Sequence, residues 1–280
     1  MATLRVMTYN IFYGGVGRQE RIREVVKEAH PDVVVFNEVS SAESFESIAE
    51  MVGPHRAVGE RHQTSGHPVI VSRWPILEKA LYGPTWEPHK FVEATIQPPG
   101  RSPVRVSGVH LTPQSFWTFE VSRWREVRSL ITHLRRRTDL PQIIAGDFNT
   151  LMTGDPIRRH GLELWVRAQM AVQGGWPRWA LKLMGKAGYV DCYRACHSRE
   201  PGFTVPAWDP GIRLDYIFAS SPLTHCLAGA GTVESSAARG SDSKPSRRPL
   251  SQLFDSKPLQ PLGGAPSDHL PVWANFDWPE

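Results

Sequence analysis

Six separate stretches of the sequence place a carboxylate, a carboxamide or an imidazole at or near the end of an apolar run. In one of them, Ser267-Asp268-His269 sets an acid and a titratable imidazole directly before the run 270–276. An apolar strand buries its length, so a polar residue at its end lies at the rim of the core. Several such rims side by side form a polar pocket on a rigid base. The residues at the other five ends are Asn10, Glu38, His110, Asp147 with Asn149, and Asp215.

The acids and amides of this set suit phosphate chemistry with a hard cation. Glu38, Asp147 and Asp268 are oxygen donors without cysteine, which favours Mg²⁺ or Mn²⁺ over zinc. Three acids would repel a bare phosphate, and a cation would neutralise the charge that develops on the phosphorus oxygens and the leaving group. Asn10 and Asn149 can donate hydrogen bonds to an anionic oxygen without adding negative charge.

The two histidines of the set can donate to phosphate oxygens or move protons; they are His110 and His269. Asp215 would hold the His269 imidazole in one tautomer and raise its basicity. Each residue also has an ordinary interpretation, such as an Asx-turn at Asp147 and Asn149. Their shared position at strand ends favours one site over six unrelated coincidences.

The elements that must position these residues alternate between strands and helices. The uneven order, with short turns between several strands, indicates a mixed sheet or two stacked sheets rather than a doubly wound parallel sheet. Helical spacing predicts helices at 18–29, 41–51 and 116–134. Apolar runs predict strands at 4–9, 33–36, 67–74, 92–96, 104–109, 142–145, 214–219 and 270–276.

Two further segments stand apart in composition. The tryptophan-rich segment 151–188 is predicted to be mostly helical and to act as core or lid. Residues 234–266 are rich in Ser, Pro, Gly and basic residues and show no periodicity, which predicts a flexible loop inserted before the Asp-His turn.

The overall composition is that of an ordinary soluble globular protein, with 40% hydrophobic and 21% charged residues. The net charge of +4 is compatible with a polyanionic partner. The three cysteines lack the spacing of a zinc site and are expected to be reduced. Neither a signal peptide nor an apolar run of about 18 residues is visible, so we expect a cytoplasmic protein without a transmembrane segment.

Five motifs, in this order along the chain, resemble the endonuclease/exonuclease/phosphatase superfamily, which includes deoxyribonuclease I. They read Thr-Tyr-Asn-Ile from residue 8, Asn-Glu-Val from 37, Gly-Asp-Phe-Asn-Thr from 146, Leu-Asp-Tyr-Ile from 214 and Ser-Asp-His-Leu-Pro-Val from 267. The resemblance implies an α/β fold, a four-layer α/β sandwich of two mixed β-sheets packed face to face with helices outside. It implies a single domain over residues 1–280.

The resemblance also implies which residues hold the cofactor and the substrate. Glu38 would be the main Mg²⁺ ligand, with Asn10 and Asp268 close to the metal or its waters. Asn149 and His110 would hold the scissile phosphate, together with Asn10.

The proton-transfer roles that the resemblance implies fall on three residues. Asp147 would orient or deprotonate the attacking water, and His269, held by Asp215, would be a general base or a stabiliser of the transition state. Arg73 either reaches a phosphate or forms a structural salt bridge.

The leading functional hypothesis is a divalent-metal-dependent phosphodiesterase, a nuclease on DNA or RNA that directs water in line at phosphorus. The basic residues of the 234–266 loop favour nucleic acid, because flexible cations add salt-dependent affinity for a polyanion. The alternatives are a phosphatase or phospholipase C-type enzyme for a lipid headgroup, inositol phosphate or small phosphoester, and a non-catalytic binding module. We expect a monomer.

Overall fold

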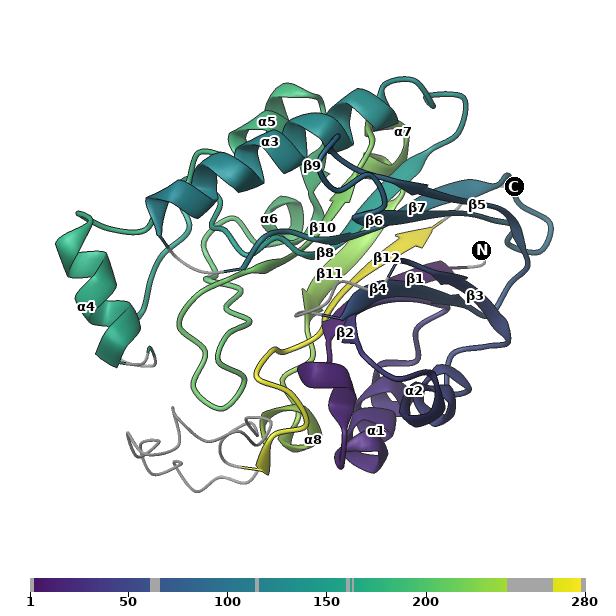
Figure 1. Ribbon diagram of the computed structural model, residues 1–280. Helices are drawn as coiled ribbons and strands as arrows, with labels where there is room; N and C mark the ends of the chain where they lie inside the picture. Colours follow the sequence, from purple (N-terminus) through teal and green to yellow (C-terminus); the bar gives the residue numbers. More distant parts are fainter. Residues whose placement is uncertain are drawn as a thin grey trace.

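The computed structural model describes residues 3–60, 66–113, 116–159, 162, 164–240 and 264–277, and two six-stranded mixed β-sheets dominate it. Figure 1 shows the two sheets stacked face to face, with helices on the outer side of each. The predicted four-layer α/β sandwich is therefore confirmed.

Each sheet contains one parallel pair of strands near its centre. The parallel pairs are β1–β2 and β7–β8, and the other pairings are antiparallel. Sheet 1 has the order β11 (Leu227–Thr232), β12 (Val272–Asp277), β1 (Thr3–Asn10), β2 (Val33–Val39), β4 (His67–Ser72), β3 (His55–Val58). Sheet 2 has the order β5 (Ile76–Tyr82), β6 (Phe91–Ile96), β7 (Val104–His110), β8 (Gln142–Asp147), β10 (Asp215–Ala219), β9 (Val190–Asp191).

Helices cover the outer face of each sheet with apolar side chains. On sheet 1, Val34 and Phe36 of β2 pack with residues of α1, α2 and α8. On sheet 2, Ile144 of β8 packs with residues of α3 and α5. The helices are α1 (Gln19–Ala29), α2 (Ala42–Ala49), α3 (Trp117–Leu134), α4 (Leu164–Val172), α5 (Lys182–Lys186), α6 (Cys192–Cys196), α7 (Ser221–Thr224) and α8 (Ser236–Arg239), with a 3-10 turn, η1, at Tyr13–Gly15.

The main core lies between the two sheets. In β2 the run Val33 to Phe36 is buried on both faces, because Val33 and Val35 point into this core while Val34 and Phe36 face the helices. Each strand contributes alternate residues to the two faces, as the period of two requires. A continuous apolar run therefore marks a central strand here.

The strand register brings the predicted polar residues to one edge of the sandwich. Parallel pairing sets Asn10 beside Asn37 in sheet 1 and His110 beside Asp147 in sheet 2. Antiparallel pairing sets Asp215 opposite Asp147. Strand β12 pairs its first residue, Val272, with Thr8, so the turn that precedes it lies at the same edge.

The sequence-based prediction missed β3, β5, β9 and β11. Strand β5 is an edge strand that is mostly exposed, so it lacks an apolar run. Strand β11 is built from small residues, and Gly231 lies so close to the Trp273 ring that a Cβ would come within 2.9 Å of it. Small residues under a large ring leave no hydrophobic signal in their own strand.

The prediction of a mostly helical segment at 151–188 was wrong in extent. Only α4 and α5 are helical within its described part, and the Gly174-Gly175 pair and Pro177 interrupt the chain between them. Of the predicted flexible loop, residues 241–263 lie outside the described residues, and α8 occupies part of the remainder. Within the described chain, none of the helices combines the length and apolarity of a membrane span.

Gly108, in β7, lies in close contact with both its own sheet and sheet 1 and offers a test of the core. A Cβ there would lie 2.9 Å from Val92 Cγ1 and 3.1 Å from Val35 Cγ1. Gly108→Ala should therefore overpack the core and lower the free energy of unfolding by about 1–3 kcal/mol in urea titration. Gly185→Ala is the matched control, because nothing lies within 4 Å of its added Cβ; equal destabilisation by both would contradict the packing account.

Candidate active site

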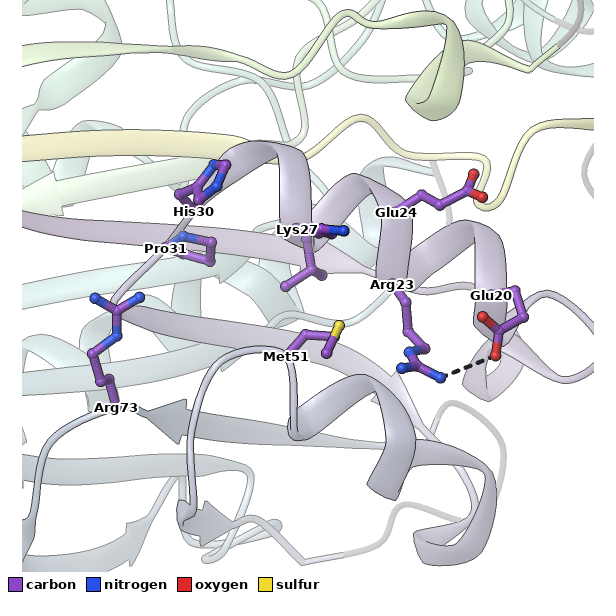
Figure 2. A pocket seen from close by; sticks show the side chains of 9 residues that line it. Glu20, Arg23, Glu24, Lys27, His30, Pro31, Met51 and Arg73 are labelled. Carbon is purple, nitrogen blue, oxygen red and sulfur yellow. Dashed lines mark hydrogen bonds and ion pairs between the residues drawn. The ribbon is translucent and has the colours of Figure 1, made fainter.

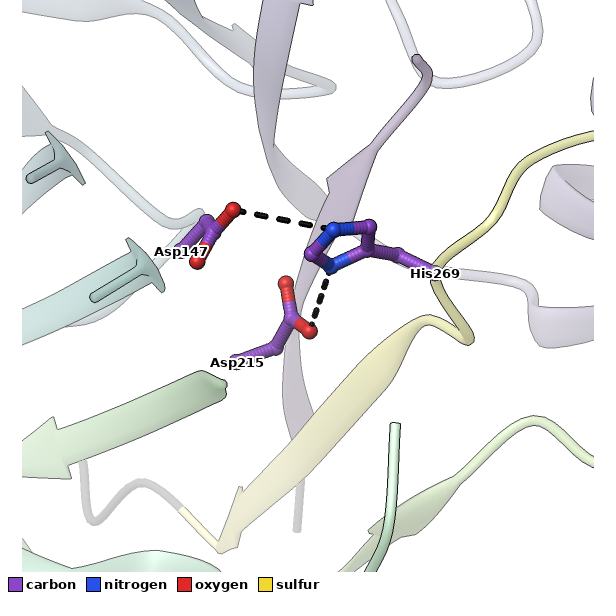
Figure 3. A group of neighbouring side chains, drawn as sticks. All are labelled: Asp147, Asp215 and His269. Atoms are coloured by element: carbon purple, nitrogen blue, oxygen red, sulfur yellow. Dashed lines mark hydrogen bonds and ion pairs between the residues drawn. The ribbon is translucent and has the colours of Figure 1, made fainter. Parts of the chain in front are cut away.

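The His269 imidazole lies between two buried acids at the shared edge of the sheets. Its Nδ1 is 2.8 Å from Asp215 Oδ2, and its Nε2 is 3.7 Å from Asp147 Oδ2 (Figure 3). Asp215 and Asp147 are each about 1% exposed and His269 is 7% exposed. The predicted pairing of Asp215 behind His269 is present, and it fixes the orientation of the ring.

The Asn10 carboxamide joins the two sheets at this edge. Its Nδ2 donates to Glu38 Oε1 and to Asp147 Oδ2, both at 3.0 Å, and its Oδ1 accepts from the Phe12 amide. Because both N–H groups are already used, the structure supports a role for Asn10 in holding two acids rather than in the predicted contact with substrate.

Glu38 reaches the site through an unusual backbone conformation. Its φ is 63°, in the left-handed region that side chains other than glycine rarely adopt, and the β2–β4 register shifts between Phe36 and Val39. Gly66 packs against this bulge, where a Cβ would lie 2.8 Å from the Glu38 carbonyl carbon. The Tyr13 amide donates to Glu38 Oε2 at 2.8 Å, which holds the carboxylate in place.

The Asp268 turn is tied to the other end of the chain. Ser267 Oγ donates to the Asn10 carbonyl at 2.6 Å and accepts from the His269 amide at 3.1 Å. The buried Arg18 guanidinium donates to the carbonyls of Pro266 and Phe12. Sequence analysis did not assign roles to Ser267 or Arg18, since hydrogen bonds to distant carbonyls leave no pattern in the sequence.

His110 and Asn149 complete the group on the side of sheet 2. His110 Nε2 lies 3.8 Å from Asp147 Oδ2. The Asn149 amide donates to Asp147 Oδ1 at 2.8 Å, and its Nδ2 donates to the Leu111 carbonyl at 3.0 Å. The Asn37 side chain bridges the sheets by donating to the Val109 carbonyl and accepting from the Asp147 amide.

The structure does not bring Arg73 to this group. Arg73 Nη1 forms a 3.0 Å ion pair with Asp32, and β4 places it beside the first residue of β2, at the opposite end from Glu38. The predicted phosphate contact is wrong and the alternative salt bridge is confirmed. Arg73 lies instead at the wall of a pocket of about 370 Å³ that is lined mainly by α1 residues (Figure 2).

Burial and mutual repulsion shift the pKa values of the site. Burial raises the pKa of Glu38 and of Asp147. Burial, with smaller contributions from Glu38 and Asp147, raises the pKa of Asp268 to about 7, although His269 opposes them. Burial alone would lower the pKa of His269, but Asp215, Asp147 and Asp268 outweigh it and raise that pKa well above its ordinary value.

The raised pKa values of Glu38, Asp147 and Asp268 indicate that these acids suit a bound cation. Burial, and to a smaller extent mutual repulsion, disfavours the charged form of these acids, and a bound divalent ion would favour that form, so the donor set fits Mg²⁺ or Mn²⁺. In the described chain one group of three possible ligands, Asp147, Asp215 and His269, has ligand atoms within 4.8 Å of one another. The 2.8 Å bond from Asp215 already occupies Nδ1 of this histidine, which favours Glu38 and Asp268 as the ligands.

The chain matches one known family over nearly its whole length. The sequence model described as the Endonuclease/Exonuclease/phosphatase family matches residues 7–269. The chain belongs to this family. Members of the endonuclease/exonuclease/phosphatase family hydrolyse phosphoester bonds with a divalent metal, so this chain is placed among the phosphoester hydrolases. A search of curated protein sequences found none that matches it.

Several solved structures share the endonuclease/exonuclease/phosphatase fold over nearly the whole chain. An AP endonuclease from Archaeoglobus fulgidus is 20% identical with a TM-score of 0.69, covering 98% of this chain and 99% of its own. The 3′ phosphatase NExo from Neisseria, bound to product DNA hairpin, is 18% identical with a TM-score of 0.67, covering 98% and 100%. A humanized D. rerio TDP2 is 17% identical with a TM-score of 0.60, covering 98% of each. At these identities the likeness shows the fold.

The raised pKa of Asp268 makes a prediction about stability without metal. Below about pH 4 the carboxyl carries a proton in both folded and unfolded chains. Between about pH 4 and 7 the unfolded chain ionises first, so the free energy of unfolding falls as pH rises. Asp268→Asn removes this penalty. Above about pH 7 in EDTA it should therefore increase the free energy of unfolding, by up to about 4 kcal/mol, and raise Tm.

Thermal unfolding of both proteins across pH, with and without Mg²⁺, checks this. The variant should lose its Tm advantage below about pH 4 and should also lose most of the Mg²⁺-induced rise in Tm. Glu28→Gln, an exposed acid on α1, is the control and should change neither quantity. A destabilised Asp268→Asn at about pH 8 would refute the raised pKa of Asp268.

Proposed function

We propose that this member of the endonuclease/exonuclease/phosphatase family is a divalent-metal-dependent phosphodiesterase that hydrolyses nucleic acid strands. The observation that carries the proposal is the imidazole of His269, 2.8 Å from Asp215 and 3.7 Å from Asp147, at the edge that also holds Glu38 and Asp268. An oriented imidazole beside an acid cluster supplies both proton transfer and charge stabilisation.

Glu38 and Asp268 would hold the cation, with Asn10 beside Glu38. When bound, the cation would neutralise the negative charge that develops on the phosphate oxygens. Asn10 fixes the relative position of Glu38 and Asp147, because its amide donates to both. His110 and Asn149 stand beside Asp147, where the His110 imidazole and the second Nδ2 hydrogen of Asn149 would donate to the scissile phosphate.

The pKa directions favour a division of labour between Asp147 and His269. The pKa of Asp147 is raised by burial, which improves it as an acceptor for the proton of the attacking water. The pKa of His269 is raised by its acidic neighbours, which favours the protonated ring as a donor to a phosphate oxygen. Asp215 keeps that ring in one orientation.

Nucleic acid is the substrate class that we favour. The net charge of +4 suits a polyanion, and two of the similar folds are named for DNA chemistry, an AP endonuclease and a 3′ phosphatase bound to product DNA hairpin. Single- and double-stranded DNA, RNA, sphingomyelin and inositol phosphates, compared with Mg²⁺ present, test the choice. Fastest turnover of a lipid or an inositol phosphate would reject nucleic acid as the substrate.

The monomeric state and cytoplasmic location stay predictions.

Metal removal should abolish activity. EDTA should stop turnover of bis-p-nitrophenyl phosphate, and added Mg²⁺ should restore it. Without the cation, the negative charges of Glu38 and Asp268 would repel the phosphate. Glu38→Gln should raise the Mg²⁺ concentration for half-maximal activity by about 10- to 100-fold or more. Glu43→Gln, an exposed acid on α2, should behave as wild type. Full activity in EDTA would exclude the metal assignment.

Removal of the imidazole should lower turnover without unfolding the protein. His269→Ala should reduce kcat by about two to three powers of ten, the usual contribution of a donor that stabilises charge in the transition state. Asp215→Asn should reduce kcat less, since the ring remains but loses its orienting carboxylate. His225→Ala, an exposed histidine, is the control. A near-wild-type rate for His269→Ala would remove this residue from the mechanism.

A further inference from the structure

On the side of sheet 2, three large aromatic side chains are exposed on segments that lead from the active-site edge. Phe116 and Trp117, at the start of α3, are 52% and 60% exposed, and Trp179, before α5, is 39% exposed. We call these three residues the aromatic rim. Figure 1 shows α5 beside α3 on the outer side of sheet 2, and α4 beyond the N-terminal end of α3. Exposed aromatics that lie together beside an active site mark an interaction surface.

A buried carboxylate connects the rim to the catalytic loop. Glu120 is fully buried, and its Oε1 accepts from the amides of Trp179 and Ala180 at 2.9 and 2.8 Å. Its Oε2 accepts from Thr150 Oγ1 at 2.8 Å, and Thr150 directly follows Asn149. The Glu120 carboxylate therefore links the Trp179 backbone directly to the turn that carries Asn149.

The first turns of α3 are anchored to the other catalytic loop in the same way. Glu126 accepts from the Thr112 amide at 3.0 Å, and Arg123 donates to the Thr112 carbonyl at 3.0 Å. Thr112 follows His110 by two residues. The start of α3, with Phe116 and Trp117, is thereby fixed next to the His110 loop.

The surface that continues from the aromatic rim along α3 and α5 is positively charged, because the acids of α3 are buried in the hydrogen bonds just described. Both acids of α3, Glu120 and Glu126, are buried, while Arg125 and Arg128 are exposed. Lys182 and Lys186 of α5 are also exposed, and no acid occurs between residues 164 and 190. The exposed charges of α3 and α5 are therefore all positive.

We propose that the aromatic rim and the exposed cations of α3 and α5 form a track for a single-stranded segment of nucleic acid that leaves the active site. The inference rests on the proposed function. Aromatic rings stack only on bases that are unpaired, whereas a row of cations follows the phosphates of any strand. Trp117 and Arg125 are eight residues apart on one helix, about 12 Å along its axis. That linear order suits an extended polyanion better than the plane of a lipid surface.

Binding of a labelled single strand tests the track apart from catalysis. Fluorescence anisotropy with the full chain in EDTA measures affinity for an oligothymidine of about 12 nucleotides and for a duplex of equal length. Trp117→Ala and Trp179→Ala should each weaken binding of the single strand by about 5- to 100-fold and affect the duplex less. Arg125→Glu should also reduce the salt dependence of binding, by about 0.7 or more in the slope.

Matched controls come from the far end of sheet 2. Leu77 is as exposed as Trp117, at 60%, and Lys79 is an exposed cation in the same strand, so Leu77→Ala and Lys79→Glu should bind as wild type. Turnover of bis-p-nitrophenyl phosphate should stay at the wild-type rate in the rim variants, because this small ester does not reach the rim. That assay reports the proposed function by itself.

Two outcomes would overturn the proposal. Wild-type affinity for oligothymidine in Trp117→Ala and Arg125→Glu, with small-ester turnover intact, would show that the track is not used. Loss of binding to phosphatidylglycerol vesicles in the same variants, with oligothymidine affinity unchanged, would assign the surface to a membrane instead. If the wild-type protein does not hydrolyse bis-p-nitrophenyl phosphate, the proposed function is rejected. The oligothymidine affinities of the variants then decide separately whether the track binds a single strand.

Discussion

Two asparagine side chains of sheet 1 fasten it to sheet 2 where the polar residues gather. Asn10 donates to Asp147, and Asn37 donates to the Val109 carbonyl while it accepts from the Asp147 amide. All of these groups are buried, so loss of one bond would leave a polar atom without water or partner. Apolar packing sets the distance between the sheets, but these amides set how the two halves of the site face each other.

The site holds strain and repulsion that the rest of the fold must offset. Phe12, Tyr13, Glu38 and Asn149 all have a positive φ, and such conformations cost about 1–3 kcal/mol each. Several acids share one buried edge, and Arg18 contributes a buried cation nearby. The large shared core of the two sheets tolerates this, which is how a rigid scaffold can carry a destabilised site.

How much the sequence predicts depends on where the physical signal lies. The central strands were predictable because burial on both faces requires a continuous apolar run, as in Val33 to Phe36. The site residues were predictable because they end those strands. Edge strands such as β5 carry no run, and the bonds of Arg18 and Ser267 depend on contacts between distant segments. The contact of Arg73 was predicted wrongly because the sequence does not show that β4 runs antiparallel to β2, which places Arg73 at the opposite end from Glu38.

Strands β1 and β12 are neighbours in space although they come from the two ends of the sequence, with Leu4 opposite Phe276. The hydroxyl of Ser267 therefore meets the Asn10 carbonyl only after a loop of more than 250 residues has closed. Such long-range pairing is slow to form and comes late in folding. The site therefore cannot assemble before β12 has docked beside β1, because Asp268 and His269 lie in the turn that this pairing positions.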